Sequence, residues 1–134
     1  MEMNKGSCLC KSVTYEINSA PYDCCFCHCS ICRKLTGSSY GTYGTVANGH
    51  FRWTAGKELL DTYAQSEQMR RLFCTACGSY MITLYALEPE NVYLSLGCLE
   101  NDGDVKIAYQ QFVGSKASWT ILDHSITQHH KWPE

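Results

Sequence analysis

Cysteine is the feature that most constrains how this chain can fold. The sequence has 134 residues, ten of them cysteines, and all but Cys98 fall in three short segments. The first segment contains Cys8 and Cys10, and the last contains Cys74 and Cys77. The middle segment contains Cys24, Cys25, Cys27, Cys29 and Cys32. Thiols clustered in this way either form disulfides or hold metal ions.

The N-terminal residues lack the apolar run typical of a signal peptide, and no apolar stretch reaches the roughly 18 residues of a membrane-spanning helix. We therefore expect a cytoplasmic protein, whose thiols stay reduced and gather around metal. Eleven Lys and Arg against 13 Asp and Glu give a formal net charge of −2. Because no basic surface is indicated, we expect neither a nucleic-acid partner nor a membrane partner. The sequence leaves the oligomeric state open.

Short segments of alternating polar and apolar residues, rich in β-branched and aromatic side chains, predict a mostly β protein. The predicted strands cover residues 13–17, 51–54, 59–63, 70–73, 80–85, 92–96 and 107–113. A helical turn is expected over residues 30–35, closed by Gly37. The length favours a single domain. We expect it over residues 1–127, followed by a polar tail over 128–134 that frays.

The segment Cys74-Thr75-Ala76-Cys77-Gly78 is typical of a zinc knuckle, in which a tight turn presents two thiolates on one side. Gly78 supplies the backbone freedom that such a turn needs. Two half-sites of this kind, from distant parts of a chain, close a four-thiolate cage that stabilises a small domain. Four thiolates also suit iron, which would colour the protein.

Spacing alone leaves two pairings of the cysteine segments open. In the first pairing, the cysteines of the first and last segments form one closed cage, and Cys27, Cys29 and Cys32 hold a second metal ion. In the second, Cys29 and Cys32 join the last segment in one ribbon-like site, and the first segment binds no metal. A zinc ion with three protein ligands keeps a fourth position for water or substrate, as in catalytic sites.

Several segments carry a longer pattern than the cysteines alone. They are Gly6-Ser7-Cys8-Leu9-Cys10, Cys27-His28-Cys29-Ser30-Ile31-Cys32-Arg33-Lys34-Leu35-Thr36-Gly37-Ser38, Arg71-Leu72-Phe73-Cys74-Thr75-Ala76-Cys77-Gly78-Ser79, Leu96-Gly97-Cys98-Leu99 and Ser115-Lys116-Ala117-Ser118-Trp119, with Asp123 following. In this order they resemble the glutathione-dependent formaldehyde-activating enzyme family over nearly the whole chain. One position departs from the family pattern, because Lys11 stands where the family usually has glycine.

The resemblance implies a fold, a metal content and an activity. The implied fold is a β-tent, a single domain of small antiparallel sheets organised around zinc. Two zinc ions per chain are implied, a catalytic one on Cys27, Cys29 and Cys32 and a structural one on the remaining family ligands. Those structural ligands are Cys8, Cys10, Cys74 and Cys77. The first pairing is therefore the one that the resemblance favours.

The activity implied by the resemblance is that of a zinc-dependent carbon–sulfur lyase acting on a thiol adduct. Such an enzyme forms or cleaves an S-hydroxymethyl-glutathione-type adduct at the open three-thiolate zinc, with glutathione as its small-molecule partner. The alternative is a zinc-stabilised binding module or chaperone-like β-tent protein without catalysis. An intact cluster of Cys27, Cys29 and Cys32 argues against that alternative, because a binding module does not need an incompletely ligated zinc.

Other residues near the cysteines have plainer interpretations. The basic residues Arg33, Lys34, Arg70 and Arg71 are expected to offset the negative charge of the metal–thiolate sites. His28 lies between two ligands, and alternation along an extended segment would point its side chain away from them. The remaining thiols, Cys24, Cys25 and Cys98, are expected to be buried or, for the first two, sensitive to oxidation.

Overall fold

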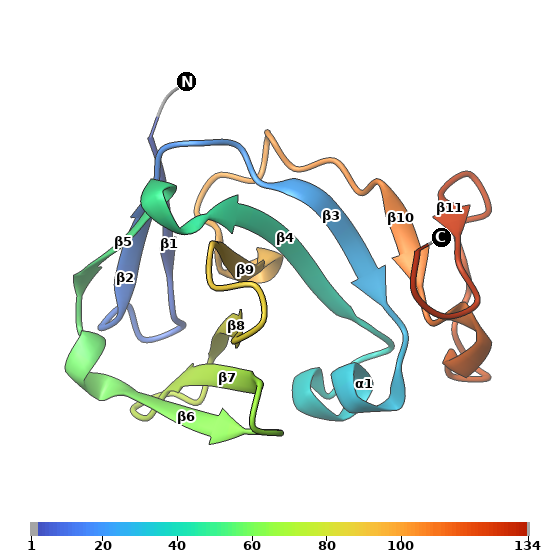
Figure 1. Ribbon diagram of the computed structural model, residues 1–134, viewed down its shortest axis with the longest axis horizontal. Coiled ribbons are helices and arrows are strands. Elements are labelled where there is room, and N and C mark those ends of the chain that lie inside the picture. The colour runs from blue at the N-terminus through green and yellow to red at the C-terminus, as the bar shows by residue number, and fades with distance from the viewer. Residues whose placement is uncertain (1–2, 134) are drawn as a thin grey trace.

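The computed structural model describes residues 3–133, which form two β-sheets and one α-helix (Figure 1). The strands are β1 (Asn4–Ser7), β2 (Thr14–Ile17), β3 (Tyr22–Cys27), β4 (Gly41–Ala47), β5 (Phe51–Ala55), β6 (Leu60–Ala64), β7 (Met69–Cys74), β8 (Tyr80–Tyr85), β9 (Asn91–Ser95), β10 (Tyr109–Gln111) and β11 (Thr127–Gln128). The helix α1 spans Ser30–Thr36, and four 3₁₀ turns cover Asn48–His50, Lys57–Leu59, Leu96–Cys98 and Val113–Ser115. The predicted mostly β fold is confirmed. No helix among the described residues is long and apolar enough to cross a membrane.

The smaller sheet has the order β1-β2-β5, and the larger has the order β11-β10-β3-β4-β9-β8-β7-β6. Nearly all neighbouring strands are antiparallel, but β10 pairs in parallel with both β3 and β11. The larger sheet curves, so that β3 and β4 arch above β6 and β7 in Figure 1, with α1 below the ends of β3 and β4. This curvature turns the end of β3 and the helix toward the strands at the far side of the same sheet.

The main core lies between the two sheets. Alternation along the segment leading into β2 buries Val13, Tyr15 and Ile17 on one face. The Tyr15 ring packs against Phe51 at 4.9 Å and edge-on against Trp53 at 5.9 Å, both on β5. A second, smaller cluster of buried side chains consists of Cys25, Cys27, Cys32 and Tyr43. The thiols of the middle cysteine segment therefore form part of a core of their own.

The sequence patterns did not reveal β3 and β4, two adjacent strands in the middle of the larger sheet. Strand β4 is buried at Tyr43 through Val46, on both faces, so it lacks the polar–apolar alternation by which a half-buried strand is recognised. Strand β3 contains Cys24, Cys25 and Cys27, which composition marks as ligands or free thiols rather than strand residues. Its buried faces become apparent only when its neighbours in the sheet are known.

The expectation that the C-terminal tail frays is wrong for residues 128–131. Strand β11 (Thr127–Gln128) crosses the predicted boundary after residue 127 and pairs with β10. Backbone hydrogen bonds follow, from His129 N to Gln110 O at 2.8 Å and from Phe112 N to Lys131 O at 2.9 Å. A composition-based argument could not find this, because the partners that fix the tail lie almost 20 residues earlier in the chain.

Candidate metal centres

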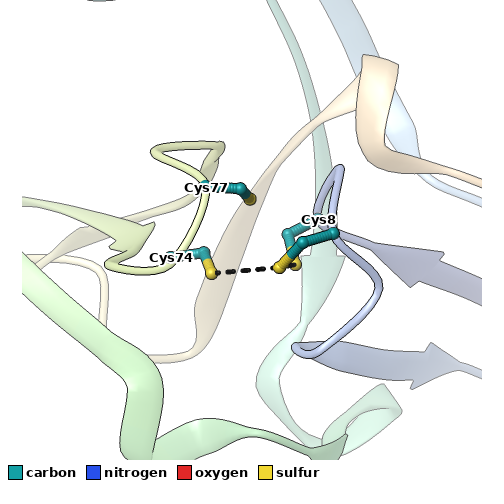
Figure 2. A group of neighbouring side chains, drawn as sticks. Cys8, Cys74 and Cys77 are labelled. Carbon is teal, nitrogen blue, oxygen red and sulfur yellow. Dashed lines mark hydrogen bonds between the residues drawn. The ribbon is translucent and has the colours of Figure 1, made fainter.

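Four cysteines far apart in the sequence meet between two turns. The sulfur atoms of Cys8, Cys10, Cys74 and Cys77 all lie within 4.8 Å of one another, and we call them the four-thiol group. Cys8 and Cys10 come from the turn between β1 and β2, Cys74 ends β7, and Cys77 lies in the turn between β7 and β8 (Figure 2). The sulfurs of Cys8 and Cys10 are 3.5 Å apart, and those of Cys10 and Cys74 are 3.9 Å apart. These distances lie on either side of the sulfur–sulfur distance in a tetrahedral zinc site. Tetrahedral zinc with Zn–S bonds of about 2.3 Å holds its sulfurs about 3.8 Å apart.

Each of these two turns depends on one residue in the left-handed backbone region. In the second turn that residue is Gly78, with φ of 80°, whose N–H donates to Cys74 O at 2.7 Å. In the first turn it is Lys11, with φ of 66°, whose N–H donates to Cys8 O at 3.1 Å. A residue with a Cβ pays a conformational cost there that glycine avoids. This explains why glycine is usual at the Lys11 position in the family that the sequence resembles.

The sulfur atoms of Cys27, Cys29 and Cys32 form a second cluster within 4.8 Å, which we call the three-thiol group. All three come from six consecutive residues at the end of β3 and the first turn of α1. The helix starts here because Cys29 is its N-cap, and the Cys29 sulfur accepts a hydrogen bond from Cys32 N at 3.3 Å. The helix ends at the predicted Gly37, with φ of 63°.

The three-thiol group concentrates negative charge on one sulfur. Hydrogen bonds from the Cys27 and Cys32 side chains, helped by backbone N–H groups at the start of α1, lower the pKa of Cys29 to about 2. The Cys27 and Cys29 side chains raise the pKa of Cys32, and the Cys29 side chain raises the pKa of Cys27. The group is therefore arranged to carry a thiolate, which is the form that binds metal.

The four-thiol group also favours a thiolate at one position. The Ser79 hydroxyl, at 3.2 Å, and the backbone of Cys10 lower the pKa of Cys77 to about 5. Burial raises the pKa of Cys74 to about 11. Backbone and hydroxyl donors aimed at sulfur are typical of zinc-knuckle turns, because they stabilise the anionic ligand. Both groups thus have a donor set that fits zinc.

The second pairing considered from the sequence, Cys29 and Cys32 with Cys74 and Cys77, is not formed among the described residues. The remaining cysteines stay outside both groups. Cys24 and Cys25 are buried, with exposures of 1% and 4%, and burial raises the pKa of Cys25 to about 12. Cys98 is half-buried in the 3₁₀ turn Leu96–Cys98, and it packs against the main core. All ten cysteines are free thiols.

His28 points away from the three-thiol group, as alternation along the chain predicts. Its ring is fully buried, and Nε2 lies 3.1 Å from the Gln110 side-chain oxygen. Burial lowers its pKa. The sequence analysis did not find Tyr43, whose hydroxyl donates to the Cys32 sulfur at 3.2 Å. No sequence signal points to this contact, because it joins α1 to the following strand β4, which the sequence patterns did not reveal.

Comparison with known sequences gives the decisive relationship. The sequence model described as "Glutathione-dependent formaldehyde-activating enzyme" matches residues 3–115, which include every member of both thiol groups. The chain belongs to this family. No curated protein matches it. Among solved structures, the chain is similar to a crystal structure of a Rhodobacter sphaeroides protein, a structural genomics target. The two are 27% identical, with a TM-score of 0.62, over 72% of this chain and 88% of that chain.

The family of glutathione-dependent formaldehyde-activating enzymes takes its name from enzymatic activation of formaldehyde with glutathione. Two separate thiol groups in this member are suited to metal binding, one with four sulfurs and one with three. The different numbers of sulfurs give the two groups different chemical capacities. Four thiolates complete the coordination of a zinc ion, and three leave one position open.

Proposed function

We propose that this chain is a zinc-dependent carbon–sulfur lyase that forms or cleaves an S-hydroxymethyl-glutathione-type adduct. The observation that carries the proposal is a largely buried group of three sulfurs, those of Cys27, Cys29 and Cys32, beside a complete set of four elsewhere. Family membership supports glutathione and formaldehyde as the reactants. Free thiols and a glutathione partner agree with a cytoplasmic location, where glutathione keeps thiols reduced.

The four-thiol group would hold the structural zinc, through Cys8, Cys10, Cys74 and Cys77. Its ligands connect turns that are 64 residues apart between Cys10 and Cys74, so metal binding there joins the smaller sheet to the larger one. The three-thiol group would hold the catalytic zinc. Two zinc ions per chain follow from these assignments.

A zinc ion in such a site supplies an open coordination position and lowers the pKa of a thiol that reaches it. In the adduct-forming direction, the glutathione sulfur forms a bond to the formaldehyde carbon as the C=O π bond breaks. The proton lost by the thiol ends on the former carbonyl oxygen, which gives a hydroxymethyl thioether. Cleavage is the reverse. The role of Cys27, Cys29 and Cys32 would be to hold the zinc ion, and with it the reacting groups, in one place.

The activity test follows the exchange between formaldehyde, glutathione and their adduct by NMR. Wild-type protein should accelerate the exchange, and Cys29→Ser should return it to the uncatalysed rate. Cys24→Ala is the matched control, because Cys24 is a buried thiol on β3, the strand that also contains Cys27, and it belongs to neither group. It should keep the wild-type rate. Zinc-loaded wild-type protein without any acceleration would reject the lyase and favour the non-catalytic binding module.

The metal content tests the assignment of the ligands separately from activity. Elemental analysis of purified protein should give about two zinc ions per chain, because the two groups provide seven sulfur ligands in separate places. Cys27→Ser should lower the content to about one. A single zinc ion that Cys27→Ser leaves unchanged would overturn the assignment of the three-thiol group, and iron in place of zinc would overturn the choice of metal.

A further inference from the structure

Arg71, on β7, is a buried arginine with only neutral partners among the described residues. Its exposure is 7%, and the ion pairs found in residues 3–133 are Lys11–Glu100 and Arg52–Glu16. Its Nε and one terminal nitrogen donate to the Gln65 side-chain oxygen at 2.9 and 2.6 Å. The other terminal nitrogen donates to the hydroxyls of Tyr80, at 2.9 Å, and Thr83, at 3.2 Å. A buried cation is costly unless an anion balances it, so this arrangement lacks a partner.

The hydrogen bonds around Arg71 lead to the three-thiol group. Tyr80, which accepts from Arg71, lies with its hydroxyl 3.5 Å from that of Tyr43, to which it donates. Tyr43 then donates to the Cys32 sulfur at 3.2 Å. The hydroxyls of Tyr80 and Tyr43 thus form a hydrogen-bonded chain that begins at the Arg71 guanidinium and ends at the Cys32 sulfur. The curvature of the larger sheet makes this possible, since β7 and β8 lie across from β4 and α1 (Figure 1).

We propose that Arg71 is the buried counter-charge of the three-thiol centre and acts on it through the hydroxyls of Tyr80 and Tyr43. The inference rests on the proposed function, because three thiolates around a divalent zinc leave one net negative charge. One buried guanidinium balances that charge. Arg71 is a positioning residue in this role, since it touches neither the metal ligands nor the reacting atoms. It raises the metal affinity of the centre.

Burial distinguishes Arg71 from the other basic residues near the cysteines. Arg70, its neighbour on β7, is exposed, and so is Lys34. Arg33 is half-buried on α1 but has no hydrogen bond to a sulfur of the group among the described contacts. Water and salt screen an exposed charge, whereas the field of a buried one reaches its neighbours with less loss. The sequence suggested four basic residues as compensating charges, and the structure favours one.

The test measures cobalt binding at the three-thiol group. After a mild chelator has removed the weaker-bound zinc, the protein is titrated with Co²⁺, and thiolate-to-cobalt absorption reports binding. Arg71→Met should weaken cobalt binding roughly tenfold, the order of magnitude expected for one buried unit charge that acts across two hydroxyl groups at an effective dielectric constant near 20. Arg70→Met, on the adjacent exposed position, should change it less than about twofold by the screening of exposed charges. Equal affinities of Arg71→Met and wild type would overturn the inference.

Two further variants separate charge from packing. Arg71→Lys keeps the charge but loses the paired hydrogen bonds to Gln65. Its cobalt affinity should therefore lie closer to that of wild type than to that of Arg71→Met. An affinity as low as that of Arg71→Met would overturn the charge role. Tyr43→Phe removes the last hydroxyl of the chain and leaves Arg71 in place, which keeps the inference testable if Arg71→Met fails to fold. It should weaken cobalt binding, and an unchanged affinity would contradict the coupling.

Two comparisons distinguish failure of this inference from failure of the proposed function. If wild-type protein binds cobalt at the three-thiol group and Arg71→Met binds it equally well, the inference fails and the metal site of the proposed function stands. If Arg71→Met weakens cobalt binding while zinc-loaded wild-type protein does not accelerate the formaldehyde–glutathione exchange, the inference stands and the lyase is rejected. If wild-type protein binds no cobalt at the three-thiol group, both fail.

Discussion

The two thiol groups offer the same ligand atom from different parts of the fold, and they differ in what each group joins. The four-thiol group connects two turns, one from each sheet, whose cysteines are 64 residues apart between Cys10 and Cys74. The three-thiol group connects only six consecutive residues, so it closes a short local loop. Metal bound to the first constrains the whole domain, and metal bound to the second constrains little of it.

The surroundings of the four-thiol group and the three-thiol group also differ. In the four-thiol group, Cys10 is exposed, and the Cys77 sulfur contacts the Ser79 hydroxyl and turn backbone. In the three-thiol group, Cys27 and Cys32 are buried, and Cys32 ends a chain of hydroxyls that starts at a buried arginine. A structural site needs only geometry, whereas a site with an open coordination position also needs control of its charge. The following predictions test this contrast.

The largest effect is expected from breaking the four-thiol group. Cys8→Ser or Cys77→Ser removes one ligand of a site whose metal binding contributes on the order of 10 kcal/mol to folding in small zinc domains. Total stabilities of domains are about 5–15 kcal/mol, so these variants should be largely unfolded or insoluble. Thermal melting with parallel zinc assays measures this. A cooperative, wild-type-like transition for either variant would contradict the structural role.

The matching change in the three-thiol group should leave the fold intact. Cys29→Ser removes one ligand but keeps an N-cap for α1, because a serine hydroxyl can accept the same hydrogen bond from Cys32 N, so the cost to stability should be small. The variant should melt cooperatively and lose one zinc ion. The contrast between the two groups would be reversed if Cys29→Ser unfolds the protein while Cys8→Ser leaves it intact.

A smaller effect concerns which thiol of the metal-free protein reacts first. At pH 6, Cys29 should be alkylated ahead of Cys25, because hydrogen bonds lower the pKa of Cys29 to about 2 and burial raises that of Cys25 to about 12. The first is therefore a thiolate at this pH and the second a thiol. Mass spectrometry after brief iodoacetamide treatment identifies the labelled residue. Preferential labelling of Cys25 would contradict the assignment of the thiolate to Cys29.

The smallest effect is expected at Lys11, beside the four-thiol group. Lys11→Gly relieves the left-handed conformation, but it loses an exposed ion pair with Glu100 at 3.0 Å and gives the unfolded chain more freedom. The free energy of unfolding should rise by up to about 1 kcal/mol. Lys11→Ala loses the ion pair without relieving the conformation, so it should be neutral or slightly destabilising by chemical denaturation. A loss of stability in Lys11→Gly larger than in Lys11→Ala would contradict this reading of the turn.

The sequence by itself determined what depends on neighbouring residues. The turn at Gly78, the short helix ending at Gly37 and the alternation through Val13, Tyr15 and Ile17 are local, and the structure has each of them. The grouping of Cys27, Cys29 and Cys32 is local as well, since six residues cannot separate their sulfurs widely. The family could also be identified from these segments, because its pattern is carried by short motifs in a fixed order.

Only the tertiary structure decided which distant segments meet. Spacing allowed Cys74 and Cys77 two partners, and the choice follows from how the turn after β1 approaches the turn after β7. The parallel pairing of β10 with β3 and the attachment of the C-terminal residues were not apparent either. The route from Arg71 to Cys32 crosses β8 and β4, elements joined by the curvature of one sheet. Contacts of this kind depend on strand order and register, which are set by the packing of the whole chain rather than by any short segment.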